Sequence, residues 1–235
     1  MAKKNKEISS SNLIKVKPIT EGQKSVFETW KQGKNQFLFG CAGTGKTFIS
    51  LYLAMQDVLD LKTKYDKVIL VRSLIPTREI GFLPGDEEDK AALYQVPYQN
   101  MVKFMFEQPN EQAFNMLYDR LKSQGSLYFL STSFLRCLTF DNSIIIVDEC
   151  QNLNFHELDT ITTRVGQDSK IIYCGDFSQT DLLKQNEKNG LHDFLRILME
   201  MQEFNCVEFN IGDIVRSGFV RNYLIQKTKL GMGME

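Results

Sequence analysis

The chain has 235 residues, a net charge of −1 at neutral pH, 43% hydrophobic residues and 24% charged residues. This composition is ordinary for a folded globular protein and excludes a disordered, collagen-like or highly charged chain. No apolar run approaches the roughly 20 residues of a membrane span or resembles a signal peptide. Five dispersed cysteines without a CxxC pair favour a reducing, cytoplasmic setting.

Hydrophobic patterning predicts a flexible basic tail at residues 1–17 and one domain over 18–235. The predicted strands cover residues 36–39, 67–72, 126–131, 143–148, 169–175 and 206–209. The predicted helices cover residues 18–31, 46–59, 156–165, 190–201 and 213–227. Residues 73–125 are less regular, and we interpret them as an inserted segment. Aliphatic strands separated by helices predict an α/β fold with a mostly parallel sheet and helices on both faces. Ligands of such folds bind at the carboxyl ends of the strands.

Both ends of the chain are basic, although the whole chain is not. Residues 1–17 contain five lysines and one glutamate, and residues 214–230 contain four basic residues and no acid. Such charges either keep the ends solvated or contact the phosphates of a nucleic acid. The charge pattern alone leaves these two interpretations open.

A glycine-rich stretch between a predicted strand and a predicted helix fits the phosphate-binding P-loop pattern, GxxxxGK followed by Ser or Thr. It consists of Gly40, Cys41, Ala42, Gly43, Thr44, Gly45, Lys46 and Thr47. Glycines let backbone N–H groups turn toward phosphates, and the helix that follows presents its positive end. Lys46 is placed to reach the β- and γ-phosphates, and Thr47 to ligate Mg²⁺. The pattern therefore predicts an ATP–Mg²⁺ site.

An apolar strand at residues 143–148 ends in the acidic pair Asp148 and Glu149. A carboxylate beside a buried strand is costly unless a cation compensates it, and nucleotide-bound Mg²⁺ would do so. Asp148 would hold the metal, and Glu149 would act as the general base toward the attacking water. An acidic pair can also just mark a helix N-terminus, but the P-loop upstream favours the catalytic interpretation.

Further motifs, taken with these two, resemble the PhoH-like ATPase family. The acidic pair continues as DECQN, with Cys150 where the family has alanine, and the next strand ends in GDFSQTD. GFLPGD at 81–86, TRVG at 163–166 and DIVR at 213–216 complete the family's series, although Ser73 and the residues after Arg136 depart from it. The resemblance covers about residues 18–225. It implies a RecA-like core related to superfamily-1 helicases, in a member that is cytoplasmic, or in the host cytoplasm if phage-encoded.

The resemblance also implies roles for two glutamines. Gln23 lies in a TEGQ stretch similar to the glutamine motif that grips the adenine edge ahead of a P-loop. Gln179 lies in the GDFSQTD stretch, where a glutamine can bond the γ-phosphate or the lytic water. Gln179 would then be the sensor of the γ-phosphate.

Phosphoryl transfer usually needs a cation on the developing γ-phosphate charge, often an arginine supplied from elsewhere. With one P-loop and one acidic strand end, the chain has no room for a second RecA-like domain. We therefore expect a homo-oligomer, with a hexameric ring as the leading form, in which a neighbour supplies the arginine. Arg216 and Arg164 are the candidates, and a salt bridge within the fold is the alternative for each.

The motifs together predict a Mg²⁺-dependent ATPase. The alternatives are an ATP-driven helicase or translocase on RNA or single-stranded DNA, and a nucleotide-dependent assembly factor of low turnover. Arg72, Arg78, Phe82 and Tyr94 are the candidate contacts to nucleic acid. The acidic run at 86–89 would repel phosphates, which favours a subunit interface for this segment. A small-molecule kinase is disfavoured, because the chain has no acceptor motif or arginine-rich lid.

Overall fold

The structure, a computed structural model, describes residues 7–72, 87–132, 135, 138–176 and 190–230. Gln179, Arg136, Arg78, Phe82 and the GFLPGD motif at 81–86 lie outside these ranges. In the described residues six strands form one sheet in the order β3-β2-β4-β5-β1-β6, and every pair is parallel. The strands are β1 (Asn35–Gly40), β2 (Lys67–Arg72), β3 (Leu127–Ser131), β4 (Ser143–Val147), β5 (Lys170–Gly175) and β6 (Phe204–Phe209). The predicted parallel sheet is thus confirmed.

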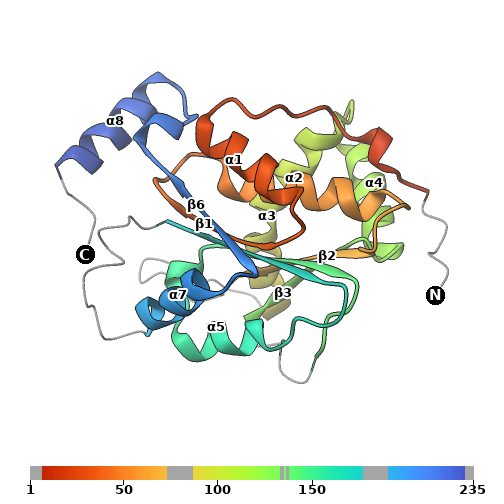
Figure 1. The fold of residues 1–235 in the computed structure, drawn as a ribbon. Helices are drawn as coiled ribbons and strands as arrows, with labels where there is room; N and C mark the ends of the chain where they lie inside the picture. The colour runs from red at the N-terminus through yellow and green to blue at the C-terminus, as the bar shows by residue number, and fades with distance from the viewer. Residues whose placement is uncertain (1–6, 73–86, 133–134, 136–137, 177–189, 231–235) are drawn as a thin grey trace.

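Helices cover both faces of the sheet, as the sequence predicts (Figure 1). One face carries α1 (Glu21–Trp30), α2 (Lys46–Leu59), α3 (Glu87–Phe106) and α4 (Glu111–Ser123). The other face carries α5 (Phe155–Thr162) and α7 (Leu191–Glu200). Short 3₁₀ turns η1 (Ser10–Asn12), η3 (Cys150–Asn152) and η4 (Ile211–Asp213) join these elements, and α8 (Gly218–Lys229) lies at one end. No helix in the described ranges is long and apolar enough to cross a membrane.

The strands are apolar on both sides because each face packs against helices. Along β1, Leu38 belongs to the cluster under α2, whereas Phe37 and Phe39 belong to the cluster under α5 and α7. The other buried strands divide their side chains in the same alternating way. Successive side chains point to opposite faces of the sheet, and helices cover both faces. Most positions along a buried strand are therefore apolar, which explains the continuous aliphatic runs.

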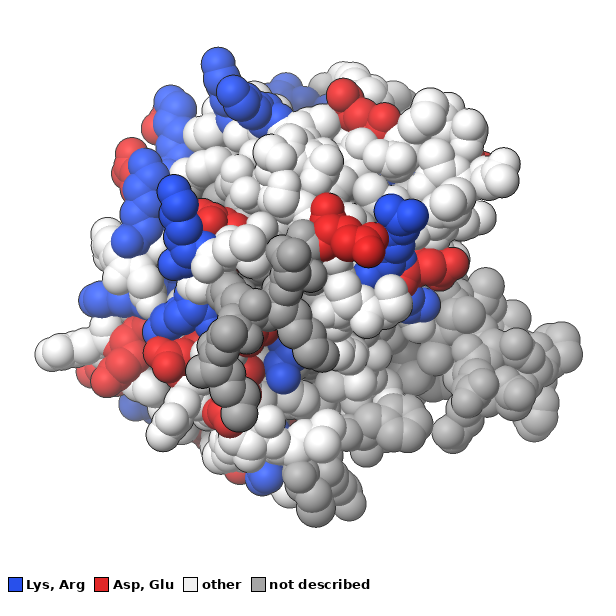
Figure 2. Space-filling model, turned by 90° about the vertical axis from the view of Figure 1, so that its right-hand side faces the viewer, with Lys and Arg blue, Asp and Glu red and all other residues white. Residues whose placement is uncertain are grey.

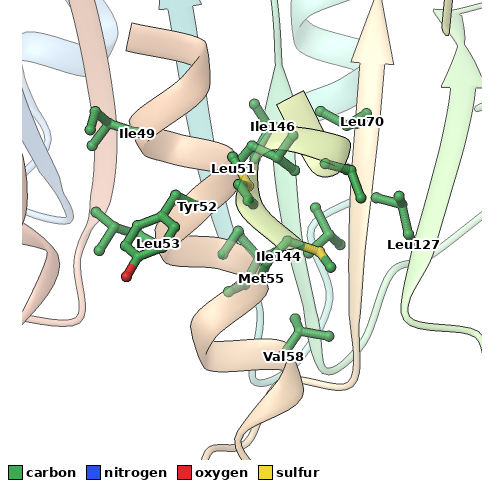
Figure 3. Close-up of a cluster of buried hydrophobic side chains, with 14 of the residues drawn as sticks. Ile49, Leu51, Tyr52, Leu53, Met55, Val58, Leu70, Leu127, Ile144 and Ile146 are labelled. Carbon is green, nitrogen blue, oxygen red and sulfur yellow. The ribbon is translucent and has the colours of Figure 1, made fainter. Parts of the chain in front are cut away.

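Helix α2 is buried on nearly all sides, because it lies between the sheet and an outer layer. Figure 3 shows Leu51 and Met55 directed toward Ile144 and Ile146 of β4. On the opposite side of α2, Tyr52 donates a hydrogen bond to the carbonyl oxygen of Ile14 at 3.0 Å. The helix that begins at the P-loop is therefore held rigidly, which fixes the direction of its N-terminus.

The predicted flexible tail is wrong for residues 7–17, which pack against the domain. Ile8 and Leu13 are buried in the same cluster as α2. The backbone N–H of Ile14 donates to the carbonyl oxygen of Met105 at 2.9 Å, and that of Val16 to the Tyr52 hydroxyl at 3.1 Å. Apolar residues alternate with lysines here, so one side of the stretch is buried while the lysines stay in water. The basic charge of the stretch was therefore a misleading sign of flexibility.

The closing helix begins at Gly218, five residues later than the predicted start at Asp213. Asp213 ends a 3₁₀ turn instead, and its carboxylate accepts from the backbone N–H groups of Gly22 and Asn210, each at 2.8 Å. The backbone N–H of Val215 then donates to the carbonyl oxygen of Gly43 at 3.0 Å. These bonds hold residues 213–216 in a non-helical path against the P-loop.

The described part of the predicted insertion is integral to the domain. Helices α3 and α4 bury Val102, Met105, Phe114 and Leu121 in the cluster that also contains α2. This segment therefore completes one face of the sheet.

Candidate active site

The P-loop connects β1 to α2 at the carboxyl edge of the sheet, as its sequence context requires. Gly40 has a φ of +118°, and a Cβ there would lie 2.1 Å from the carbonyl oxygen of Phe209. A Cβ on Gly43, whose φ is +73°, would lie 2.8 Å from the Cγ of Arg216. Only glycine fits at these two positions, because the end of β6 and the segment that follows it pack directly against the loop.

Lys46 is only 8% exposed, and its ammonium group is held within the loop. It donates to the carbonyl oxygens of Gly40 at 3.1 Å and Cys41 at 2.8 Å. It also forms a 3.0 Å ion pair with the carboxylate of Asp176, directly after β5. The only lysine of the P-loop is thus positioned by the loop itself and paired with an acid that a phosphate would have to replace.

Thr47 and Asp148 face one another across the site. The Thr47 hydroxyl donates to Oδ1 of Asp148 at 2.7 Å, and the Tyr98 hydroxyl donates to Oδ2 at 2.7 Å. A hydroxyl and a carboxylate are hard oxygen donors of the kind that Mg²⁺ prefers. The described residues contain no cluster of three acids, cysteines or histidines that would bind a metal alone. This donor set fits Mg²⁺ held jointly by Thr47, Asp148, water and the phosphates of a nucleotide.

Glu149 has a backbone φ of +53°, which is strained for a residue with a side chain. Its carboxylate accepts a 2.6 Å hydrogen bond from the side-chain amide of Gln151. The amide oxygen of Gln151 in turn accepts from the backbone N–H of Asp176 at 3.0 Å. Burial, and then the neighbouring Asp148, raise the pKa of Glu149. Glu149 is therefore an oriented carboxylate that is more basic than an exposed glutamate.

Gln23 contacts the P-loop from α1. Its side-chain oxygen accepts from the backbone N–H of Ile19 at 3.0 Å, and its side-chain nitrogen donates to the carbonyl oxygen of Thr44 at 3.0 Å. Gln23 is 4% exposed. It braces the loop in this structure, and its contact with an adenine edge stays a prediction.

The two candidate arginines lie at opposite edges of the sheet. Arg216 packs its aliphatic stem against Gly43 and lines the cavity beside the P-loop of its own chain. Arg164 follows α5, where Phe140 and Val165 form a parallel bridge just before β4 and β5 begin. That is the amino edge, away from the P-loop of the same chain. The role of either arginine in a neighbour's site stays a prediction.

A cavity of about 830 Å³ opens between the P-loop, the acidic strand end and two segments that sequence reasoning did not place there. One is residues 14–17, where Lys15 and Lys17 reach the pocket. The other is α3, which contributes Tyr98 and Phe104. The spacing of Pro97, Met101 and Phe104 at three and four residues could have signalled one helix face, but nothing local indicated what that face meets.

Arg72 at the end of β2 also reaches this cavity. Burial lowers its pKa, but the Tyr98 hydroxyl and the charges of Asp148 and Glu149 raise it more, so the pKa is raised overall. Its guanidinium lies 5.8 Å from the centroid of the Tyr94 ring. The predicted nucleic-acid contacts Arg72 and Tyr94 thus pair with each other beside the acidic strand end.

A parallel α/β sheet with a P-loop after β1, a paired Thr–Asp and an acidic strand end defines a P-loop nucleotide-binding protein. The family model described as "PhoH-like protein" matches residues 15–226, so the chain belongs to the PhoH-like protein family.

Curated relatives agree with this assignment. A PhoH-like protein of Synechocystis is 33% identical over 186 residues, which cover 79% of this chain and 54% of the relative. A PhoH-like protein of Bacillus subtilis is 31% identical over 208 residues, covering 88% of this chain and 61% of the relative. The chain therefore spans only about half to three fifths of the length of these relatives.

Among solved structures, the large terminase from a thermophilic bacteriophage shares the fold. Its TM-score is 0.53 at 12% identity, and the match covers 90% of this chain and 50% of the terminase.

Proposed function

We propose that the chain is an ATPase that binds ATP with Mg²⁺ and hydrolyses it. The observation that carries the proposal is the convergence of Lys46, the Thr47–Asp148 pair and Glu149 at one cavity. These are the separate parts that phosphoryl transfer requires: a cation for the phosphates, ligands for a metal, and a base for water. The large terminase that shares the fold was solved in complex with ADP, which is compatible with a nucleotide in this type of site.

Each residue has a role that follows from its place. The P-loop N–H groups and the N-terminus of α2 would cradle the phosphates, and Lys46 would leave Asp176 to bind the β- and γ-phosphoryl oxygens. Thr47 and Asp148 would hold Mg²⁺, which neutralises charge on the phosphates when bound. Glu149, oriented by Gln151, would accept the proton of the attacking water. Gln179 in the GDFSQTD motif is proposed as the γ-phosphate sensor.

The test of this proposal is the variant Glu149→Gln, which preserves shape and removes the base. Wild type is expected to release phosphate from ATP, and the variant to lose about 100-fold or more of this activity while still binding the fluorescent analogue mant-ATP. Phosphate release and fluorescence titration measure the two properties. An unchanged rate in Glu149→Gln would contradict the assigned base and favour a protein of low turnover.

We also propose that the chain works as a homo-oligomer, with a hexameric ring as the expected form, and that Arg164 completes a neighbour's site. Arg164 lies at the amino edge, away from the P-loop of its own chain, so it could serve only the site of another copy.

Mixing two inactive variants tests the neighbour's arginine directly. Arg164→Ala and Glu149→Gln are each expected to be inactive alone, and their mixture to regain activity, because intact Glu149 and intact Arg164 then meet between subunits. A matched mixture of Arg216→Ala with Glu149→Gln should stay inactive, since both changes disable the same pocket. No recovery in the first mixture, together with a monomeric mass by light scattering, would contradict the proposal.

A second candidate function is an RNA or single-stranded DNA translocase, and one observation favours it. Helix α8 exposes Phe219 by 84% and Tyr223 by 60%, and it carries Arg221 with no acid nearby in sequence. Exposed aromatics among basic residues suit base stacking and phosphate contact. On the face shown in Figure 2, the described basic side chains lie among acidic ones.

The double variant Phe219→Ser with Tyr223→Ser separates a protein partner from a nucleic acid at α8. A lower oligomer mass would show that α8 contacts another copy. An unchanged mass with lost stimulation of ATP hydrolysis by single-stranded RNA or DNA would show the nucleic-acid role. That stimulation should also fall steeply as the salt concentration rises.

A further inference from the structure

Tyr98 lies in α3, far along the chain from the P-loop and the acidic strand end. It is 2% exposed, and its hydroxyl donates to Oδ2 of Asp148 at 2.7 Å. Its ring packs in the cluster between the sheet and α2, 5.7 Å from the ring centroid of Phe129. The ring thus contributes to the core while the hydroxyl reaches the cavity.

The two oxygens of Asp148 are divided between two donors. Oδ1 accepts from Thr47, which the P-loop places, and Oδ2 accepts from Tyr98, which α3 places. A carboxylate with one fixed donor can still rotate about its side-chain bonds, whereas two donors from separate elements fix its plane. This arrangement matches the common use of outer hydrogen bonds to orient a metal-binding carboxylate.

Other buried tyrosines in the described ranges use their hydroxyls differently. The Tyr52 hydroxyl bonds to backbone groups of residues 14 and 16, and the Tyr173 hydroxyl bonds to Thr162 at 2.6 Å. Tyr98 differs because its partner is a carboxylate of the candidate site.

We propose that Tyr98 is the positioning residue for Asp148, which it holds in the orientation that receives the magnesium-bound nucleotide. The proposal rests on the ATP–Mg²⁺ function above and deepens it. It predicts that the hydroxyl matters only when the metal is present, because ATP without Mg²⁺ is held by Lys46 and the P-loop. It also makes α3 part of the site, although α3 contributes none of the motif residues.

Tyr98→Phe tests the proposal, since it removes the hydroxyl and keeps the buried ring. Titration with mant-ATP is performed in excess Mg²⁺ and in EDTA, and phosphate release is measured as a function of Mg²⁺ concentration. The variant should match wild type in EDTA, and its affinity in Mg²⁺ should fall about 10-fold. The Mg²⁺ concentration for half-maximal phosphate release should rise by a similar factor.

Tyr118→Phe is the matched control, because Tyr118 is a buried tyrosine of the adjacent helix α4 in the same cluster. It should retain the wild-type Mg²⁺ dependence. Equal Mg²⁺ dependence in Tyr98→Phe and wild type would overturn the proposal. So would an equal loss of affinity in EDTA and Mg²⁺ with a lowered urea midpoint, since that pattern means a structural role. If wild type itself neither hydrolyses ATP nor binds it more tightly with Mg²⁺, the proposed function fails instead.

Discussion

The two edges of the sheet both bury charge, but they do so in different ways. At the carboxyl edge, Lys46 is paired with Asp176, and Asp148 is bonded by Thr47 and Tyr98. At the amino edge, Lys170 is 2% exposed and lies 4.0 Å from the centroid of the Trp30 ring. Burial lowers the pKa of Lys170 to about 8.

This difference separates a functional arrangement from a structural one. A shifted pKa often marks a functional site, yet Lys170 is shifted and lies against aromatic rings, remote from the cavity. At the carboxyl edge the charged groups converge on open space, and each is oriented by a specific donor or acceptor. Convergence and orientation, and not the size of a pKa shift, identify the site.

The largest expected effect comes from Lys46→Ala at the carboxyl edge. Removing the cation that faces the phosphates should lower kcat/KM for ATP by roughly 100- to 1000-fold. The urea midpoint should change little, because Asp176 at the rim remains solvated. Steady-state phosphate release and urea unfolding provide the two measurements. Retained activity would contradict the placement of the phosphates.

Lys170→Met removes the buried charge at the amino edge. In contrast to Lys46→Ala, it should change the stability and leave ATP hydrolysis unchanged. The folded-state pKa of Lys170 is about 8 and its ordinary value is 10.5, so the unfolded chain binds this proton more readily. The contribution of Lys170 to the free energy of unfolding is therefore least favourable below pH 8, and it becomes more favourable as the pH rises toward 10.5. From the difference between these two pKa values, Lys170→Met should be more stable by about 3 kcal/mol at pH 7, with the difference vanishing near pH 10.5.

Urea midpoints of both proteins at pH 7 and pH 9.5 measure this prediction, and comparison with wild type removes the effects of other titrating groups. ATP hydrolysis should stay at the wild-type rate. A parallel pH dependence in the two proteins would show that Lys170 is not the group responsible.

Gln151→Leu tests how Glu149 is oriented. The substitution removes the amide that bonds both the Glu149 carboxylate and the backbone of Asp176. We expect kcat to fall about 10-fold while the affinity for mant-ATP stays near wild type. A change in affinity without a change in kcat would show that Gln151 acts in nucleotide binding and does not orient Glu149.

The smallest effect is expected from Asp176→Asn, which weakens the ion pair to Lys46. Asp176 is 36% exposed, so solvent screens the pair. Freeing Lys46 for phosphate should tighten ATP binding by about threefold, as measured by mant-ATP titration. Weaker binding would show that Asp176 supports the nucleotide and does not compete with it.

Local patterns were sufficient for much of this account. The P-loop, the acidic strand end and the strands could be predicted because each depends on neighbouring residues: glycine geometry in 40–45, aliphatic runs in β2 and β4, and the cap of α1 at Thr20. The family motifs could be recognised for the same reason.

The features that the sequence did not predict depend on contacts between residues that are far apart along the chain. Nothing near Tyr98 in sequence indicates that its hydroxyl meets Asp148, 50 residues later. The segment at 7–17 looks like a solvated tail until Leu13 meets the core that α2 provides. The contact of Arg216 with Gly43 of its own chain was also not foreseen, because it depends on how residues 213–216 turn.

The central claim is that one pocket both holds ATP and cleaves its β–γ bond. The most direct measurement follows γ-labelled ATP in a single turnover with excess wild-type protein and Mg²⁺. Wild type should release the label as phosphate, with ADP left in equal amount, and Glu149→Gln should retain intact bound ATP. Bound ATP that wild type leaves uncleaved under these conditions would contradict it.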